Sequence, residues 1–209
     1  MSIGMLLLLM LSILILFGVV DRVLDRMALT DRQALFLTAA LFIGGLLPDL
    51  SFGLISVNIG GALVPLGVCI YLLIHAGTGK ERLRALAASA VSAAVICAIG
   101  FYFPAYPEET AMDPMLLYGL AGGFTAWLLG RSRRSAFIAG VLGMLLADLI
   151  SGVTVWAQGI QQTIHLGGAG AMDAVVISGI TAVLLCELVG EIMERMTRGP
   201  KPMEGGQHA

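Results

Sequence analysis

Long apolar blocks recur along the whole chain, and they restrict its fold more than any other feature of the sequence. Each block holds about 20 residues that are apolar on every face, the length of helix that crosses ~30 Å of hydrocarbon. Apolar residues make up 58% of the 209 residues and charged residues only 12%, with a mean hydropathy of +0.93. Soluble domains carry about twice that charged fraction. We therefore predict an all-α, polytopic transmembrane helical bundle.

The blocks predict seven spans in a single transmembrane domain over residues 1–195. The first block has no positively charged region before it and no A-x-A cleavage pattern, so we interpret it as a retained span and not a signal peptide. The Gly- and Pro-rich polar tail, residues 196–209, is expected to be disordered in the cytoplasm. The predicted spans are 3–20, 33–50, 54–75, 85–103, 115–130, 136–157 and 161–187.

The basic residues predict the orientation of these spans. All 12 Lys and Arg residues lie in the loops after the first, third and fifth spans or in the segment after the seventh. The loops around 51–53, 104–114 and 158–160 contain none. Short cytoplasmic loops collect Lys and Arg. The pattern therefore predicts a multi-pass inner-membrane protein with its N-terminus outside and its C-terminus in the cytoplasm.

Two pairs of similar segments occur in the same order and predict a parallel internal repeat. Residues 46–53, at the end of the second span, resemble residues 145–152 in the sixth. Residues 56–62, at the start of the third span, match residues 163–169 at the start of the seventh. Spans two and three would then correspond to spans six and seven. Repeats build many transporters, whose binding site lies near the membrane midplane at the repeat interface.

Glycines stand at matching places in the two repeat units. They would let helices approach closely, or break a helix and free its backbone groups for a ligand. These helix-packing or helix-breaking candidates are Gly60, Gly61, Pro65, Gly167, Gly168 and Gly170.

Two acidic residues inside the predicted spans are the main functional candidates, because an Asp at a helix centre costs about 2.5–3.5 kcal/mol to insert. Asp148 lies roughly 20 Å above the inner face at the helical rise. Asp173 lies at the same depth if the seventh span ends near Glu187, which the repeat favours. Two carboxylates close together in low dielectric cannot both ionise. The pair would therefore bind a proton or a small cation.

Three more polar residues are expected above this pair, and simpler structural roles stay open for several of the candidates. Each Asp of the pair could instead stay protonated and hydrogen-bond a neighbouring helix backbone. Asp49 could simply cap the outer turn of its helix, and His165 could lie at the outer interface. The three are Asp49, Asn58 and His165.

The cysteines and the charges point to few other ligands. Cys69, Cys97 and Cys186 lie inside predicted spans without CxxC spacing, which is typical of small apolar packing residues and not of a metal site or a disulfide. We expect no metal, no cofactor and no nucleic acid. The lipid bilayer is the expected partner, with a proton or small cation as ligand, and a homo-oligomer stays open.

Two stretches resemble a bacterial and archaeal family of small polytopic membrane proteins known only as a domain of unknown function. One is Asn58-Ile59-Gly60-Gly61-Ala62 followed by Pro65. The other combines Ala147-Asp148-Leu149 with Gly167-Gly168-Ala169-Gly170 and Asp173. The resemblance covers roughly residues 40–200 and implies no activity. Ala174 departs from the Gly expected after the second Asp.

The order of Asp148 and Asp173 is also similar to that of the GxGD intramembrane aspartyl proteases. That family places one Asp on an outward-running helix and the other on the next, inward-running helix after a Gly-rich stretch. Here Ala171 and Met172 separate Gly170 from Asp173, so the motif is not matched, and no Pro-Ala-Leu segment follows.

Three functions therefore stay open. The first is a small transporter or channel-like protein, linked to protons or cations, with Asp148 and Asp173 as the titrating pair. The second is an aspartyl protease that uses the same two residues as acid and base. The third is a non-catalytic membrane scaffold or assembly factor. A cavity that reaches Asp148 would separate the first two from the third.

Overall fold

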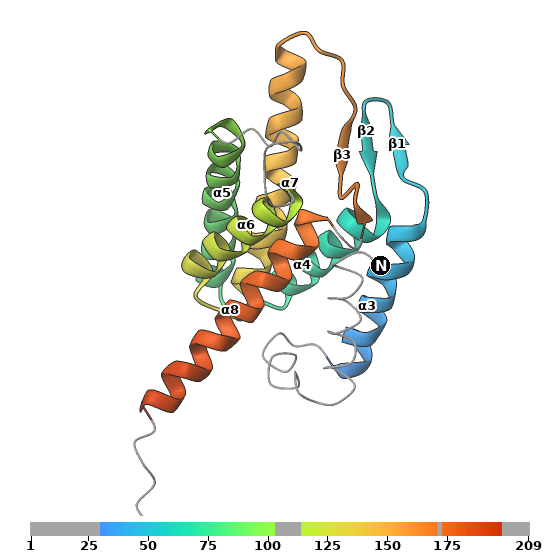
Figure 1. The fold of residues 1–209 in the computed structure, drawn as a ribbon. Coiled ribbons are helices and arrows are strands. Elements are labelled where there is room, and N and C mark those ends of the chain that lie inside the picture. Colours follow the sequence, from blue (N-terminus) through green and yellow to red (C-terminus); the bar gives the residue numbers. More distant parts are fainter. Residues whose placement is uncertain (1–29, 103–113, 171–172, 198–209) are drawn as a thin grey trace, which may run out of the picture.

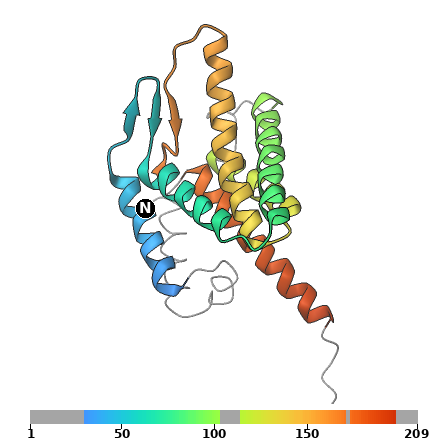
Figure 2. The same ribbon diagram turned by 180° about the vertical axis from the view of Figure 1, so that it is seen from behind.

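The computed structural model describes residues 30–102, 114–170 and 173–197, which form helices and one small sheet (Figures 1 and 2). The predicted span 3–20 and nearly all of the tail lie outside these residues. The helices are α3 (Asp31–Leu46), the π-helical segment η1 (Ile59–Leu63), α4 (Val64–Ile74), α5 (Gly79–Tyr102), α6 (Pro114–Gly130), α7 (Arg133–Ala157) and α8 (Ala174–Thr197). The strands are β1 (Leu50–Phe52), β2 (Ile55–Val57) and β3 (Ile164–Leu166).

The last four helices form the main bundle, with α7 packed against α5, α6 and α8. Small residues let these helices approach closely: a Cβ on Gly140 of α7 would lie 2.9 Å from the carbonyl oxygen of Ser178 on α8. A Cβ on Gly143 would lie 2.7 Å from the Cβ of Ser92 on α5. Such contacts hold helices together in lipid, where no hydrophobic driving force acts between them.

Three helices of the described residues are long and apolar enough to cross a membrane. They are α5 with 24 residues, α7 with 25, and residues Ala174–Glu194 of α8 with 21. The helical membrane character predicted from the apolar blocks is therefore supported. The predicted spans 85–103, 115–130 and 136–157 correspond to α5, α6 and α7. The count of seven spans stays a prediction.

A three-stranded sheet is the feature that the all-α prediction missed (Figure 1). β1 and β2 form an antiparallel hairpin, and β3 pairs with β2 in parallel, with Ser56 opposite His165. Gly53, at a φ of +64°, provides the left-handed position in the hairpin turn. The sheet joins the first half of the chain to the second.

The sheet corrects three predicted spans. Span 33–50 ends as a helix at Leu46, and span 54–75 begins as strand β2 and becomes α-helical only at Val64. The first residues of span 161–187 form β3 and a turn, so α8 begins at Ala174 and runs on to Thr197. The physical reason is that a short apolar run has the same hydropathy in a strand and in a helix, so length and composition do not separate the two.

The two predicted repeat units follow the same order of elements in part. In the first unit, α3 is followed by the β1–β2 hairpin, two glycines and α4. In the second unit, α7 is followed by β3, two glycines and α8. The first matched segments differ, because Asp49 follows the end of α3 whereas Asp148 lies inside α7. The match of 46–53 with 145–152 is therefore not supported by the local structure.

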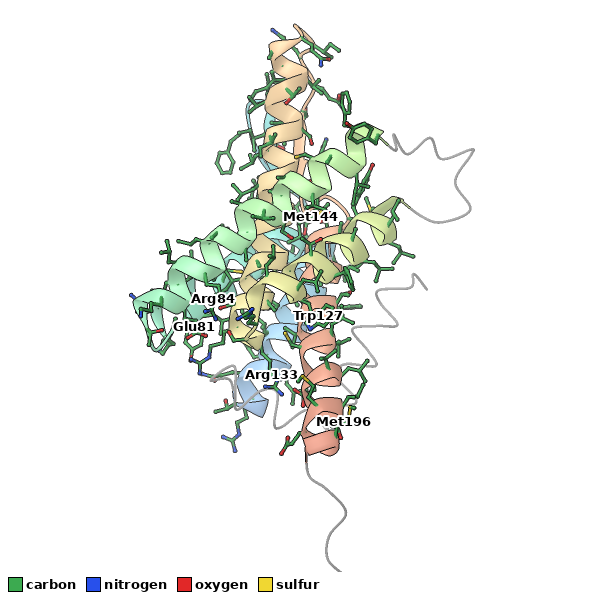
Figure 3. All side chains as sticks on the ribbon, turned by 90° about the vertical axis from the view of Figure 1, so that its left-hand side faces the viewer. Glu81, Arg84, Trp127, Arg133, Met144 and Met196 are labelled. Carbon is green, nitrogen blue, oxygen red and sulfur yellow. The ribbon has the colours of Figure 1, made fainter. Side chains whose placement is uncertain are left out.

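The loops after α4 and α6 meet at one end of the molecule. Arg134 donates to the carbonyl oxygen of His75 at 3.1 Å, and Ser132 donates to Glu81 at 3.0 Å. Figure 3 shows Glu81, Arg84 and Arg133 below Met144, towards this end. We call it the arginine-rich end, defined by Lys80, Arg82, Arg84, Arg131, Arg133 and Arg134.

Candidate functional site

The two main acidic candidates, Asp148 and Asp173, lie within α7 and directly before α8. Asp148 lies in the second half of α7 and is partly buried, whereas Asp173 directly precedes α8 and is only 7% exposed. The charge of Asp173 acts on the carboxyl group of Asp148. The fold therefore places the two acidic side chains within electrostatic range of each other, where the chain returns from the sheet into α8.

Asp173 is fixed by the backbone around it. One carboxylate oxygen accepts a hydrogen bond from the N–H of Val175 at 2.9 Å, and the other accepts from the N–H of Ala169 at 3.2 Å. It thus caps the N-terminus of α8, where N–H groups lack helical partners and the helix dipole favours negative charge. Asp173 has a structural role as well as its place in the pair.

Asp148 has no such support. Within residues 30–102, 114–170 and 173–197 its carboxyl group has no hydrogen-bond partner, and Cys97 of α5 lies beside it. The thiol of Cys97 approaches the carbonyl oxygen of Ala147 at 3.9 Å and the side chain of Ser151 one turn further along α7. Asp148 is therefore the member of the pair that the described residues hold less firmly.

The other three predicted polar residues meet at the sheet and form a second cluster. Asn58 donates to one carboxylate oxygen of Asp49 at 2.8 Å, and Ser56 donates to the other at 3.1 Å. His165 of β3 lies 3.9 Å from the same carboxylate. Asn58 is 3% exposed, whereas the side chain of His165 is 59% exposed. No described contact links this sheet cluster to the Asp148–Asp173 pair.

Ser56 is the member of the sheet cluster that the sequence analysis did not identify. In a helix, Ser56 and Asn58 would point in directions 200° apart, but in an extended strand residues i and i+2 share a face. A period-two reading of residues 50–58 would have grouped Ser56 with Asn58. Asn58 also accepts from the N–H of Gly61 at 2.9 Å, so it caps η1.

The predicted glycines form the crossing between the two clusters. A Cβ on Gly60 would lie 2.2 Å from the nitrogen of Gly45 in α3, and one on Gly61 would lie 2.1 Å from the carbonyl oxygen of Gly167. Gly167 and Gly170 have φ values of +66° and +61°, which favour glycine. At this crossing η1 meets the turn between β3 and α8 backbone to backbone.

Two of the predicted packing residues have other surroundings. Gly168 is exposed, and a Cβ there would lie 3.1 Å from the Cβ of His165, three residues earlier in the chain. Pro65 is buried in the first turn of α4, where its missing N–H leaves no gap in the helical hydrogen bonding.

Metal-binding groups are not assembled in the described part of the chain. No set of three or more His, Cys, Asp and Glu side chains there could hold a metal ion. The cysteines Cys69, Cys97 and Cys186 are free thiols.

Comparison with known proteins gives one match. A family model described as "Protein of unknown function (DUF1614)" matches residues 9–185. No curated protein and no solved structure matches the chain.

Proposed function

We propose a function for this chain as a member of the family of proteins of unknown function (DUF1614), to which it belongs because the family model matches most of its length. The proposal is a small multi-pass transporter of the inner membrane, linked to protons or a small cation. Asp148 and Asp173 are its titrating pair. The observation that carries the proposal is that Asp148 lies within electrostatic range of Asp173, a carboxyl group buried at the start of α8.

The geometry around the pair supports ion binding. Two carboxylates in one low-dielectric site do not both carry a free charge at neutral pH, so the pair holds a proton or a cation. Asp173 is held in place by two backbone N–H groups, whereas the carboxyl group of Asp148 has no hydrogen-bond partner among the described residues. Exchange of the ligand at Asp148 would leave the cap of α8 intact.

The interrupted helices support transport over a purely structural role. The chain passes from β3 through a glycine turn into α8, so the backbone at the pair is not continuous helix. Secondary transporters form substrate and ion sites at such interruptions, where helix ends and unwound backbone meet near the midplane. Non-helical backbone at membrane depth is otherwise costly unless it is buried in protein or lines a cavity.

The test is ion flux in liposomes that contain the purified full-length chain. A potassium diffusion potential, negative inside, drives protons inward, and a trapped pH-sensitive dye records the change. The same liposomes are then tested with sodium and potassium gradients. We expect flux in the wild type and a rate equal to that of protein-free liposomes in Asp148→Asn and Asp173→Asn. Asn caps a helix about as well as Asp, so α8 should stay folded in Asp173→Asn.

The control is Glu81→Gln, which removes a carboxylate in the first turn of α5, outside the pair. It should transport like the wild type. Wild-type flux in Asp148→Asn, or no flux of any of the three ions in the wild type, would contradict the proposal and favour a scaffold. Cleavage of an unstructured protein in detergent, abolished in both Asp variants, would instead identify an aspartyl protease.

A further inference from the structure

A groove with a volume of about 510 Å³ opens between α3 and α4. Its walls are apolar and include Phe36 and Leu37 of α3 and Val68 of α4. Neither Asp148 nor Asp173 lines it. The groove is therefore a separate feature from the acidic pair, and its role is independent of ion transport by that pair.

The groove exists because α3 and α4 touch closely only near η1. There, Gly60 of η1 packs against the backbone of Gly45. Further along α4, Gly67 faces the groove, and a Cβ built on it would have no atom within 4 Å. Phe36, across the groove on α3, is 77% exposed. The described helices thus leave an apolar slot that none of their side chains fills.

The mouth of the groove is basic. Arg32, in the first turn of α3, is exposed and lines the groove. Tyr71, at the same end of the groove, lies one turn before His75, whose carbonyl oxygen accepts from Arg134. The groove therefore opens towards the arginine-rich end, with a guanidinium group at its entrance.

We propose that this groove binds an anionic phospholipid, with one acyl chain between α3 and α4 and the phosphate on Arg32. The volume falls in the range of small-molecule sites, about 300–1,000 Å³. The apolar walls match an acyl chain. The guanidinium group matches a phosphate, to which it donates two parallel hydrogen bonds. Basic pockets between membrane helices on the cytoplasmic side bind anionic headgroups in this way.

The experiment measures lipid binding to the full-length chain in detergent by native mass spectrometry. Phosphatidylglycerol and phosphatidylcholine with identical acyl chains are added in turn. The wild type should prefer phosphatidylglycerol. Arg32→Gln should weaken phosphatidylglycerol binding about fivefold, the effect of one basic residue near the headgroups, and weaken phosphatidylcholine binding less, because the choline cation offsets the charge of its phosphate. Gly67→Leu should fill the slot and reduce the binding of both lipids.

Two matched controls separate this site from general effects. Arg84→Gln removes one positive charge from the arginine-rich end outside the groove, and Gly100→Leu adds the same side chain to α5, where a Cβ would meet only the hydroxyl of Tyr118 at 3.8 Å. Both should bind lipid like the wild type. Gly67→Leu should fold, because its side chain enters open space and Leu favours helix over Gly.

Three results would overturn the proposal. The first is equal binding of the two lipids by the wild type. The second is unchanged phosphatidylglycerol binding in both Arg32→Gln and Gly67→Leu. The third is an equal loss in Arg84→Gln and Arg32→Gln, since that would mean a diffuse charge effect without a defined site.

Discussion

Single side chains in this protein join backbone elements that hydropathy alone treats as separate. Asn58 is the clearest case, because its amide donates to Asp49 and its carbonyl accepts from the N–H of Gly61. One buried residue therefore both fixes the carboxylate that follows α3 and caps η1. The sequence analysis expected Asp49, Asn58 and His165 at a similar level, and the structure brings them together. From the estimated depth in the membrane, the sequence also placed these three residues above the acidic pair. No described contact links the two groups.

The replacement of Asn58 by Ala should destabilise the protein. It leaves Asp49 with one fewer donor and removes the cap of η1, and together these losses cost about 1–3 kcal/mol. Thermal unfolding in detergent, followed by the helical circular-dichroism signal, should show a lower midpoint. Ser51→Ala, at an exposed position of β1, is the control and should leave the midpoint unchanged. Equal midpoints for Asn58→Ala and the wild type would show that the sheet cluster adds no stability.

At the scale of elements, the sequence predicted the continuous helices well and the interruptions poorly. The runs that became α5 and α7 each contain an apolar stretch of 18 residues, which is longer than strands usually are. The segments at 50–57 and 164–166 are apolar too, but they pair across 109 residues of sequence, as in Ser56 with His165. Pairing at that distance leaves no local signal beyond β-branched residues and glycine at the turn. Four of the glycines picked out from the sequence lie at close backbone contacts, namely Gly60, Gly61, Gly167 and Gly170.

Two glycine substitutions should have opposite effects although both lie in the η1–α4 segment. Gly61→Ala places a methyl group where the carbonyl oxygen of Gly167 lies 2.1 Å away, so the crossing must open. We expect a loss of about 3 kcal/mol or more, at the upper end for overpacking. Gly67→Ala enters open space inside a helix and should gain about 1 kcal/mol. The measurement is the thermal midpoint in detergent, and a Gly61→Ala protein as stable as Gly67→Ala would refute the close crossing.

For the molecule as a whole, the charged loops fit the orientation deduced from the basic residues. The loops after α4 and α6 touch through Arg134 and Ser132, as expected for loops on one side of a membrane. α8 continues past the bundle to Met196 in Figure 3, and Glu187 near its middle pairs with Arg133. Which side of the membrane this end faces follows only from the positive-inside rule.

Single cysteines in a chain without Cys69, Cys97 and Cys186 test the orientation. Thr78→Cys, Ser132→Cys and Pro200→Cys should be protected from an impermeant thiol reagent in intact cells, and Thr110→Cys should be labelled. The reason is that the first three flank basic loops or the C-terminus, and residue 110 lies in an acidic loop without Lys or Arg. Permeabilised cells serve as the control, in which all four should react. Labelling at 132 without labelling at 110 would reverse the topology.

The parallel pairing of β2 with β3 has a consequence for how the chain is made. The N–H of Asn58 donates to Leu166 and the N–H of Ile164 donates to Leu54, so the hairpin of the first half has an open edge until the ribosome has produced residue 166. Unpaired backbone groups are costly in hydrocarbon. We therefore expect this edge of the sheet to close only after β3 has been made. A chain cut short before residue 166 would leave this edge of β2 without its partner strand.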